Sequence, residues 1–112
     1  MRPKSPKKIP VLFYRTTAGS EPAREWIKTL PDSDRNAVGQ DLMRVQFGWP
    51  VGMPLCRPLD GGLWEVRTSL DDQREARVLF FFHEGRIGVV KTQRTPQAEL
   101  DLARKRMKEM KS

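Results

Sequence analysis

Residues 63–70 read Leu-Trp-Glu-Val-Arg-Thr-Ser-Leu, residues 75–83 read Glu-Ala-Arg-Val-Leu-Phe-Phe-Phe-His, and residues 87–94 read Ile-Gly-Val-Val-Lys-Thr-Gln-Arg. The first run alternates between apolar and polar side chains, which is typical of a strand with one buried face. The second run is apolar nearly throughout, as expected of a central strand that is covered on both faces. The three runs predict consecutive strands around which the rest of the chain is arranged.

The segment around Asp72 predicts a tight hairpin between the first two strands. A hairpin centred there pairs Trp64 with Phe80 and makes one face of the two strands consistently apolar. On the other face it places Arg67 directly opposite Arg77. Like charges in such a pair are unfavourable by roughly a few tenths of a kcal/mol. We therefore interpret the two arginines as a binding site for an anion.

The remaining patterns predict helices before and after these strands in the chain. A short strand at 11–15 precedes an amphipathic helix with Ser20 as its N-cap, and a second helix extends to Trp49. Residues 48–62 carry three prolines and four glycines, which predicts an irregular connector. Thr95 and Pro96 open a final helix.

The order β-α-α-β-β-β-α predicts an α+β fold. We expect a small, mostly antiparallel sheet of four strands, with an N-terminal helical hairpin on one face and a C-terminal helix nearby. Residues 1–10 hold four cations, three prolines and no acid, which predicts a flexible basic arm. Residues 11–112 then form a single domain with one modest core.

The formal net charge of the 112 residues is +7. A basic domain of this kind favours a polyanionic partner, of which nucleic acid is the commonest, although many small basic proteins bind none. The single cysteine excludes an internal disulfide and fits a reducing cytoplasm. No apolar run approaches the length of a membrane span, and the charged N-terminus lacks the pattern of a signal peptide. We expect a soluble, cytoplasmic protein with no membrane partner.

The sequence contains few residues that could bind a metal or act as a nucleophile. Cys56 and His83 are the only cysteine and histidine, so neither a cysteine cluster nor a His-rich metal site can form, and no Ser-His-Asp arrangement is recognisable. His83 lies at a turn and is expected to be an exposed imidazole without a role. We therefore expect no metal and no cofactor.

Cations and polar groups converge instead at one edge of the predicted sheet. Lys91, Gln93 and Arg94 leave the last strand beside Arg67 and Arg77. A surface of this kind can hold a phosphate through its guanidinium groups and can stabilise negative charge in a phosphoryl transition state.

Three further residues belong to this surface or border it. Glu65 lies on the same face as Arg67 and is the only local candidate for a general base. The alternative is an ordinary surface ion pair between the two, worth less than about 1 kcal/mol. Arg57 either reaches the sheet face or is simply an exposed arginine. Arg104 belongs to a group of cations that the dipole of the final helix also explains.

Three runs together resemble a known family: Gly-Gly-Leu-Trp-Glu-Val-Arg at 61–67, Arg-Val-Leu-Phe-Phe-Phe at 77–82 and Lys-Thr-Gln-Arg-Thr-Pro at 91–96. The chain is similar to the HigB-like, phage-derived branch of the RelE/ParE toxin superfamily over roughly residues 11–110. The Lys-Thr-Gln-basic-Thr-Pro run, with the helix that follows it, is the most specific part. The resemblance implies a RelE-like fold for the domain at 11–112.

The resemblance also implies the activity of a type II toxin, a metal-independent endoribonuclease that cuts mRNA on the ribosome and so inhibits translation. The family's arginine after the Trp-Glu-Val run matches Arg67, and the arginine that opens the next strand matches Arg77. Its basic exit from the last strand matches Lys91 and Arg94. The first two would hold the scissile phosphate and the last two would assist the leaving oxygen, with Glu65 as the candidate base. Further RNA contacts are expected from Arg57, Gln93 and Arg104.

The partners that the resemblance implies are a helix-turn-helix (HigA-like) antitoxin, mRNA on the ribosome, and operator DNA bound through the antitoxin. We expect the antitoxin to contact the helical hairpin around Trp26 and Trp49, or the basic C-terminal helix. Two other functions stay open. The protein could grip RNA or the ribosome without cutting, or it could be a ParE-like inhibitor of a protein target such as gyrase.

Overall fold

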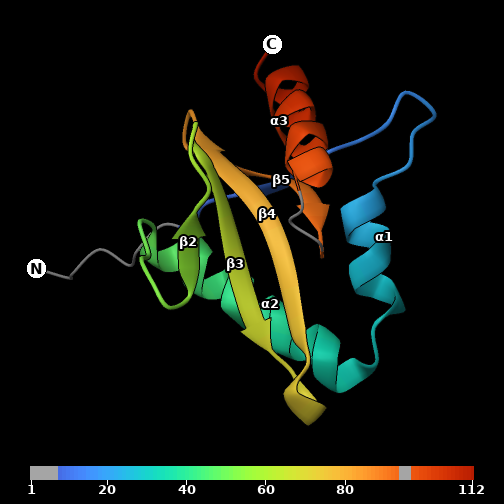
Figure 1. Ribbon diagram of the computed structural model, residues 1–112, viewed down its shortest axis with the longest axis vertical. Coiled ribbons are helices and arrows are strands. Elements are labelled where there is room, and N and C mark those ends of the chain that lie inside the picture. The colour runs from blue at the N-terminus through green and yellow to red at the C-terminus, as the bar shows by residue number, and fades with distance from the viewer. Residues whose placement is uncertain (1–7, 94–96) are drawn as a thin grey trace, which may run out of the picture.

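The structure is a computed structural model that describes residues 8–93 and 97–112 (Figure 1). It confirms the α+β class, the helical hairpin and the C-terminal helix. Among the helices that it describes, none has the length and apolar character needed to cross a membrane. The elements in chain order are β1 (Val11–Phe13), α1 (Pro22–Thr29), α2 (Asp32–Gly48), β2 (Cys56–Pro58), β3 (Leu63–Ser69), the short 3-10 helix η1 (Asp71–Gln73), β4 (Glu75–His83), β5 (Arg86–Thr92) and α3 (Gln97–Lys111).

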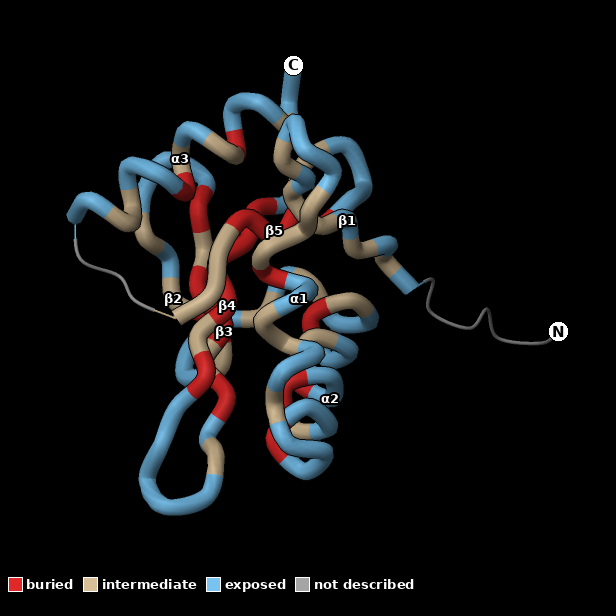
Figure 2. The backbone as a smooth tube through the Cα atoms, turned by 90° about the vertical axis from the view of Figure 1, so that its right-hand side faces the viewer, coloured by how far each residue is buried: buried red, intermediate tan, exposed pale blue. Residues whose placement is uncertain are grey.

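One mixed sheet separates the helices into two layers. Its strand order is β1-β5-β4-β3-β2, with β1 parallel to β5 and all other neighbours antiparallel. Helices α1 and α2 cover one face and α3 covers part of the other (Figure 2). The larger core lies under α1 and α2 and includes Val38 and Phe80. A smaller core under α3 includes Leu79 and Met107.

The predicted register of the central hairpin is confirmed. Trp64 lies opposite Phe80 and Arg67 lies opposite Arg77. The chain reverses at η1, where Asp72 has a φ of 59°, a left-handed conformation that aspartate tolerates better than most residues. Strand β4 lies between β3 and β5 and is buried on both faces through its middle, as its apolar run predicts.

The expected count of four strands is wrong by one, because β2 lies inside the connector at 48–62. Its residue Cys56 pairs with Val66 of β3 at the outer edge of the sheet. A three-residue strand that ends in a proline is compatible with an edge position, and it is too short to show alternation in the sequence. The strand matters for the site because it brings Arg57 opposite Glu65.

The chain before α2 also differs from expectation. Ser20 does not cap α1, because the N-cap position is Glu21, which makes no side-chain capping hydrogen bond. The hydroxyl of Ser20 instead lies 2.8 Å from the hydroxyl of Thr16 in the preceding loop. Of the basic arm expected at 1–10, residues 1–7 lie outside the described part. Ile9 already exchanges two 2.9 Å hydrogen bonds with Gln46 of α2, so the chain is held against the domain from this residue.

Candidate functional site

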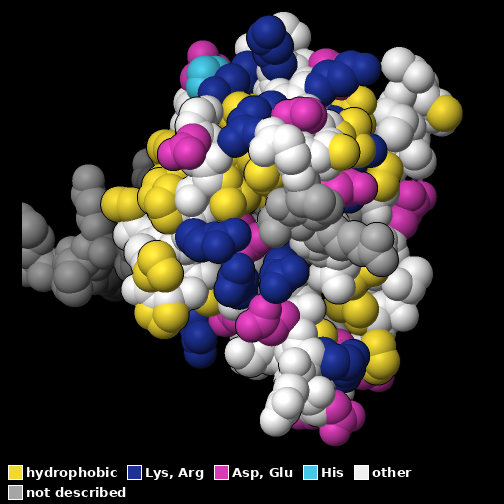
Figure 3. All heavy atoms as spheres, in the orientation of Figure 1, with side chains coloured by type: hydrophobic (Ala, Val, Ile, Leu, Met, Phe, Trp, Pro, Cys, Tyr) yellow, Lys and Arg dark blue, Asp and Glu magenta, His cyan; other side chains and the backbone are white. Residues whose placement is uncertain are grey.

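Helix α3 lies over one end of its sheet face and does not extend over the hairpin end (Figure 2). Side chains that face the α3 side there form two rows across the strands. One row contains Arg57, Glu65 and Lys91 of β2, β3 and β5. The next contains Arg67 and Arg77 of β3 and β4. Lysine and arginine side chains gather in the middle of this face (Figure 3), and we call Arg57, Glu65, Arg67 and Arg77 the arginine cluster.

Glu65 is the buried centre of the arginine cluster. Its side chain is 0% exposed, and its Oε1 accepts a 2.7 Å hydrogen bond from Nε of Arg67. A terminal guanidinium nitrogen of Arg57 lies 3.6 Å from the same oxygen. The hydrogen bond to Glu65 raises the pKa of Arg67. The interpretation of an ordinary surface ion pair is therefore wrong, because this carboxylate is removed from water and holds its arginine neighbours in place.

Among the residues that the structure describes, three buried polar atoms of the cluster have no hydrogen-bond partner: Nε of Arg57, Nε of Arg77 and Oε2 of Glu65. An unpaired buried donor or acceptor typically costs about 1–3 kcal/mol, so three at neighbouring positions of one sheet face need an explanation. Two of them are guanidinium donors. The arrangement fits a ligand that accepts hydrogen bonds from arginine, such as a phosphate.

Arg77 faces Arg67 across the hairpin, but each arginine has a carboxylate of its own. A guanidinium nitrogen of Arg77 lies 3.3 Å from Glu75, two residues earlier on β4, while Arg67 binds Glu65. These carboxylates offset the repulsion that the register implies, so the two arginines coexist without an added anion. Their side chains remain 36% and 35% exposed, which leaves guanidinium surface open to a ligand.

Lys91 and Gln93 lie beside the cluster, and each also has a structural task. Nζ of Lys91 is 2.6 Å from Oε2 of Glu99 in α3. The side-chain oxygen of Gln93 accepts a 3.0 Å hydrogen bond from the backbone N–H of Arg77, and the Gln93 N–H donates to the Arg77 carbonyl at 2.7 Å. Gln93 therefore prolongs the pairing past the end of β5 and fixes the backbone that carries Arg77.

Two predicted site residues are not placed in the cluster. Arg104 donates a 2.7 Å hydrogen bond to the carbonyl of Leu59, so its guanidinium ties α3 to the segment between β2 and β3. Arg94 lies outside the described residues. Arg57, in contrast, does reach the sheet face, because its pairing in β2 places it against Glu65.

Sequence reasoning missed the two carboxylates that pair with Arg77 and Lys91. The signal for Glu75 was available, since the predicted register puts it on the same face as Arg77 and two residues before it. Glu99 had no such signal. Its contact with Lys91 depends on how α3 packs against β5, which the periodicity of a helix does not specify.

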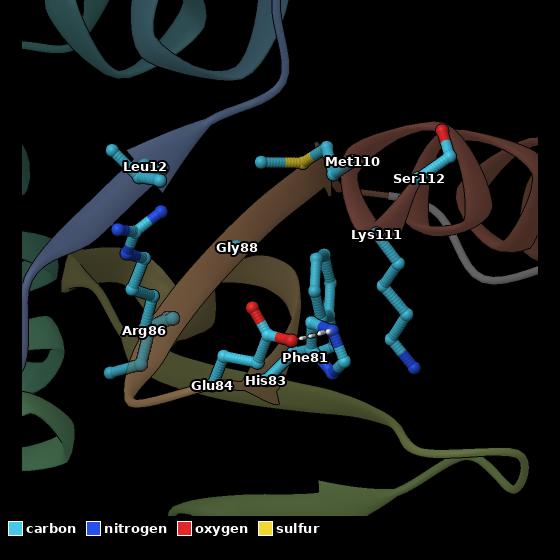
Figure 4. A pocket seen from close by; sticks show the side chains of 10 residues that line it. Leu12, Phe81, His83, Glu84, Arg86, Gly88, Met110, Lys111 and Ser112 are labelled. Atoms are coloured by element: carbon cyan, nitrogen blue, oxygen red, sulfur yellow. Dashed lines mark ion pairs between the residues drawn. The ribbon is translucent and has the colours of Figure 1, made fainter.

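The single histidine lies near the other end of the sheet. His83 is partly buried and sits 3.7 Å from Glu84, about 20 Å along β4 from Arg77 at the usual rise per residue of a strand. A hollow of about 220 Å³ opens there, with Arg86 on one side and Lys111 of α3 on the other (Figure 4). His83 therefore does not contribute to the arginine cluster.

The described residues present guanidinium groups at this site and no cluster of metal ligands. Within residues 8–93 and 97–112, no group of three or more His, Cys, Asp or Glu side chains is placed to bind a metal ion. Guanidinium groups that are fixed on an open face can bind phosphate oxygens and stabilise charge that develops on them.

Comparison with known proteins assigns the chain to a family. The sequence pattern of the family described as Phage derived protein Gp49-like (DUF891) matches residues 25–108, a range that includes the whole arginine cluster. No curated protein matches the chain. Because the family pattern covers well over half of the residues, the chain belongs to the phage-derived Gp49-like family, which is a RelE-like toxin family.

Proposed function

We propose that this protein is the toxin of a type II toxin–antitoxin system and that it cuts mRNA on the translating ribosome. Membership of the Gp49-like family supports the toxin assignment. The observation that supports RNA cleavage is that Arg57, Arg67 and Arg77 lie together on one sheet face, the first two against the buried carboxylate of Glu65. Within the described part of the chain, Nε of Arg57 and Nε of Arg77 have no hydrogen-bond acceptor. The net charge of +7 favours approach to the polyanionic surface of a ribosome.

The reaction that fits these residues is a transesterification within the RNA. The ribose 2′-hydroxyl attacks the adjacent phosphorus and the bond from phosphorus to O5′ breaks, which leaves a 2′,3′-cyclic phosphate and a 5′-hydroxyl. Arg67 and Arg77 bind the non-bridging phosphate oxygens and stabilise the charge that develops on them. Lys91 or Arg94 gives a proton to the leaving O5′, and water takes the proton of the 2′-hydroxyl and returns one to the donor.

Glu65 serves this reaction as a positioning residue. Its carboxylate is fully buried, which supports a role in holding Arg57 and Arg67 rather than in proton transfer to or from an RNA bound at the surface. Without a positioned base, the acceleration must come from orientation of the reacting atoms and from electrostatic stabilisation. A ribosome that holds the mRNA in a reactive conformation would supply part of the orientation, which accounts for the expected ribosome dependence.

A non-cleaving module that binds RNA or the ribosome is the second candidate. The observation in its favour is that Arg67, Arg77 and Lys91 already have carboxylate partners at 2.7, 3.3 and 2.6 Å. Cations that are neutralised in this way bind phosphate less strongly and stabilise a transition state less. Such a module would protect ribosome-bound mRNA without producing new ends.

The 5′ ends of the RNA distinguish between the two candidate functions. Ribosomes programmed with a defined mRNA are mixed with the toxin, and 5′ ends are mapped by primer extension and tested for labelling by polynucleotide kinase. We expect new ends that accept phosphate directly, because they carry a 5′-hydroxyl. Cleavage should persist in excess EDTA as long as intact ribosomes are present, since no protein-bound metal takes part in the proposed reaction. New ends that carry a 5′-phosphate would contradict the mechanism, and intact mRNA would favour the binding module.

The proposed system also needs a partner. A helix-turn-helix antitoxin that covers the cationic face would keep the toxin from the ribosome, and the complex would bind operator DNA through the antitoxin. Inhibition of a protein target such as gyrase would instead arrest growth while leaving the mRNA intact.

A further inference from the structure

A hollow of about 560 Å³ borders the arginine cluster on the α2 side. Helix α2, the connector before β2 and strand β3 form its walls, and Arg67 is shared between the hollow and the cluster. Its position follows from the shortness of β2, which pairs with β3 only as far as Val66. Beyond the bond from the Arg67 N–H to the Leu55 carbonyl, the edge of β3 opens onto this hollow.

The chemistry of the walls suits an uncharged, planar and polar group. The lining contains two arginines and two carboxylates: Arg44 binds Asp41 at 3.0 Å, and Arg67 and Glu75 lie on the same face of the hairpin. The hollow therefore has little net charge of its own. Ala37 and Leu55 supply apolar surface, while the exposed side chains of Gln40 and Ser69 supply an amide and a hydroxyl.

These properties match what a nucleobase requires from a protein. Bases in single-stranded RNA are held by stacking on flat side chains, including guanidinium planes, and by hydrogen bonds to their edges. An amide such as that of Gln40 can donate and accept at once, which allows it to distinguish one base edge from another. The volume also lies within the range of roughly 300–1,000 Å³ that is usual for ligand pockets.

We propose that this hollow receives the nucleobase next to the phosphate held by Arg67 and Arg77, and that Gln40 reads the edge of that base. The proposal rests on the proposed function for the identity of the substrate as RNA. It follows from the position of Arg67, which belongs both to the cluster and to the lining of the hollow. A phosphate bound at Arg67 would have one of its two neighbouring nucleosides at the mouth of the hollow. The base preference of the toxin is then set by α2 and not only by the sheet.

The test uses an RNA that binds but cannot be cut. The probe is a trinucleotide with 2′-O-methyl groups, prepared with each of the four bases at its central position and also without a base there. Each is titrated at millimolar concentration into the isotope-labelled full chain, and amide chemical shifts are followed. We expect the base-containing probes to shift the amides of Ala37, Gln40 and Ser69 and the abasic probe to shift only those near Arg67 and Arg77.

Variants of α2 sharpen the test. Ala37→Leu fills the hollow and Gln40→Leu removes the amide, whereas Asn36→Leu changes a neighbouring exposed residue that does not line it. We expect the first two variants to bind the four base-containing probes with affinities within about twofold of that for the abasic probe. Their thermal unfolding temperatures should stay unchanged. The third should keep the discrimination of the natural chain. Equal binding of all probes by the natural chain, or shifts around Trp26 and Thr92 in place of the hollow, would overturn the proposal.

This outcome is independent of cleavage. If the protein binds the probes in the hollow but leaves mRNA intact on ribosomes, the nucleobase site is supported and the proposed cleavage is refuted. If it cuts mRNA but shows no chemical-shift changes at the hollow, the cleavage is supported and the nucleobase site is refuted.

Discussion

The two arginines that face each other across the hairpin are held by different contacts. Arg67 satisfies an oxygen of the buried Glu65, whereas Arg77 pairs with Glu75, whose side chain is 42% exposed. Removing Arg67 leaves a carboxylate that is out of water with only Arg57 nearby at 3.6 Å. Removing Arg77 leaves a carboxylate that water can solvate. Substitutions at the two positions should therefore have the same effect on function but different effects on the free energy of unfolding.

We expect Arg67→Ala and Arg77→Ala each to abolish growth arrest at matched expression, with a loss of about 10²–10³ in cleavage rate for a lost transition-state contact. Arg67→Ala should lower the free energy of unfolding by roughly 1–3 kcal/mol because it leaves Glu65 unsatisfied. Arg77→Ala should change it by no more than about 0.5 kcal/mol. Urea titrations measure both, with the exposed Arg35→Ala as control. Full toxicity of either variant would place the phosphate elsewhere.

At this scale the sequence predicts which residues share a face but not how deeply they lie. Alternation in β3 and the position of the turn suffice to put Arg67 opposite Arg77. The burial of Glu65 could not be predicted, since carboxylates are rarely fully buried and the side chain is enclosed by β2, a strand that the sequence does not reveal.

Strands β4 and β5 make one notably close contact at Gly88. Gly88 lies beneath the ring of Phe81 on β4, and a Cβ at this position would lie 2.3 Å from Cε1 of that ring. Phe81 is itself 4% exposed in the smaller core under α3, so the ring has little room to withdraw. The ring of Phe81 therefore occupies the space that a side chain at position 88 would need, on a strand that pairs directly with β4.

We expect Gly88→Ala to destabilise the protein by about 1–3 kcal/mol through overpacking. Gly39→Ala is the matched control, because nothing lies within 4 Å of its Cβ position in α2 and alanine favours a helix by about 0.8–1.0 kcal/mol over glycine. Thermal and urea unfolding should therefore shift in opposite directions for the two variants. In a Phe81→Leu background the cost of Gly88→Ala should fall, and an unchanged cost would show that the ring is not its cause.

At the scale of the whole molecule, two of the arginines of α3 are held by contacts within the protein. Arg104 and Arg106 bind the carbonyls of Leu59 and Val90, and Arg106 also lies over the ring of Tyr14 at 4.8 Å. The exposed cations of α3 are instead Lys105, Lys108 and Lys111. The sequence predicts this helix and its group of cations, but the tertiary contacts of its arginines depend on the docked position of α3.

The helical hairpin likewise offers less surface to an antitoxin than its tryptophans suggest. Trp26 packs against the larger core, and Trp49 packs edge-on against Trp64 and Phe80, with ring centroids 5.0 and 5.4 Å apart. Both are partly buried. The cationic face of α3 is therefore the better candidate for the first encounter with an acidic antitoxin.

We expect association with the proposed antitoxin to be steered by these lysines. Its on-rate, measured by stopped-flow, should fall steeply between about 50 and 500 mM salt as the Debye length drops from over 10 Å to a few Å. The variant Lys108→Glu should lower the on-rate at low salt several-fold and flatten its salt dependence, since steering scales with the local field. Lys28→Glu on α1 is the control, because it changes an equally exposed lysine away from α3 and should have a smaller effect. Equal effects of the α3 and α1 variants would mean that net charge alone steers the encounter, and a salt-independent on-rate would mean that apolar contacts govern it.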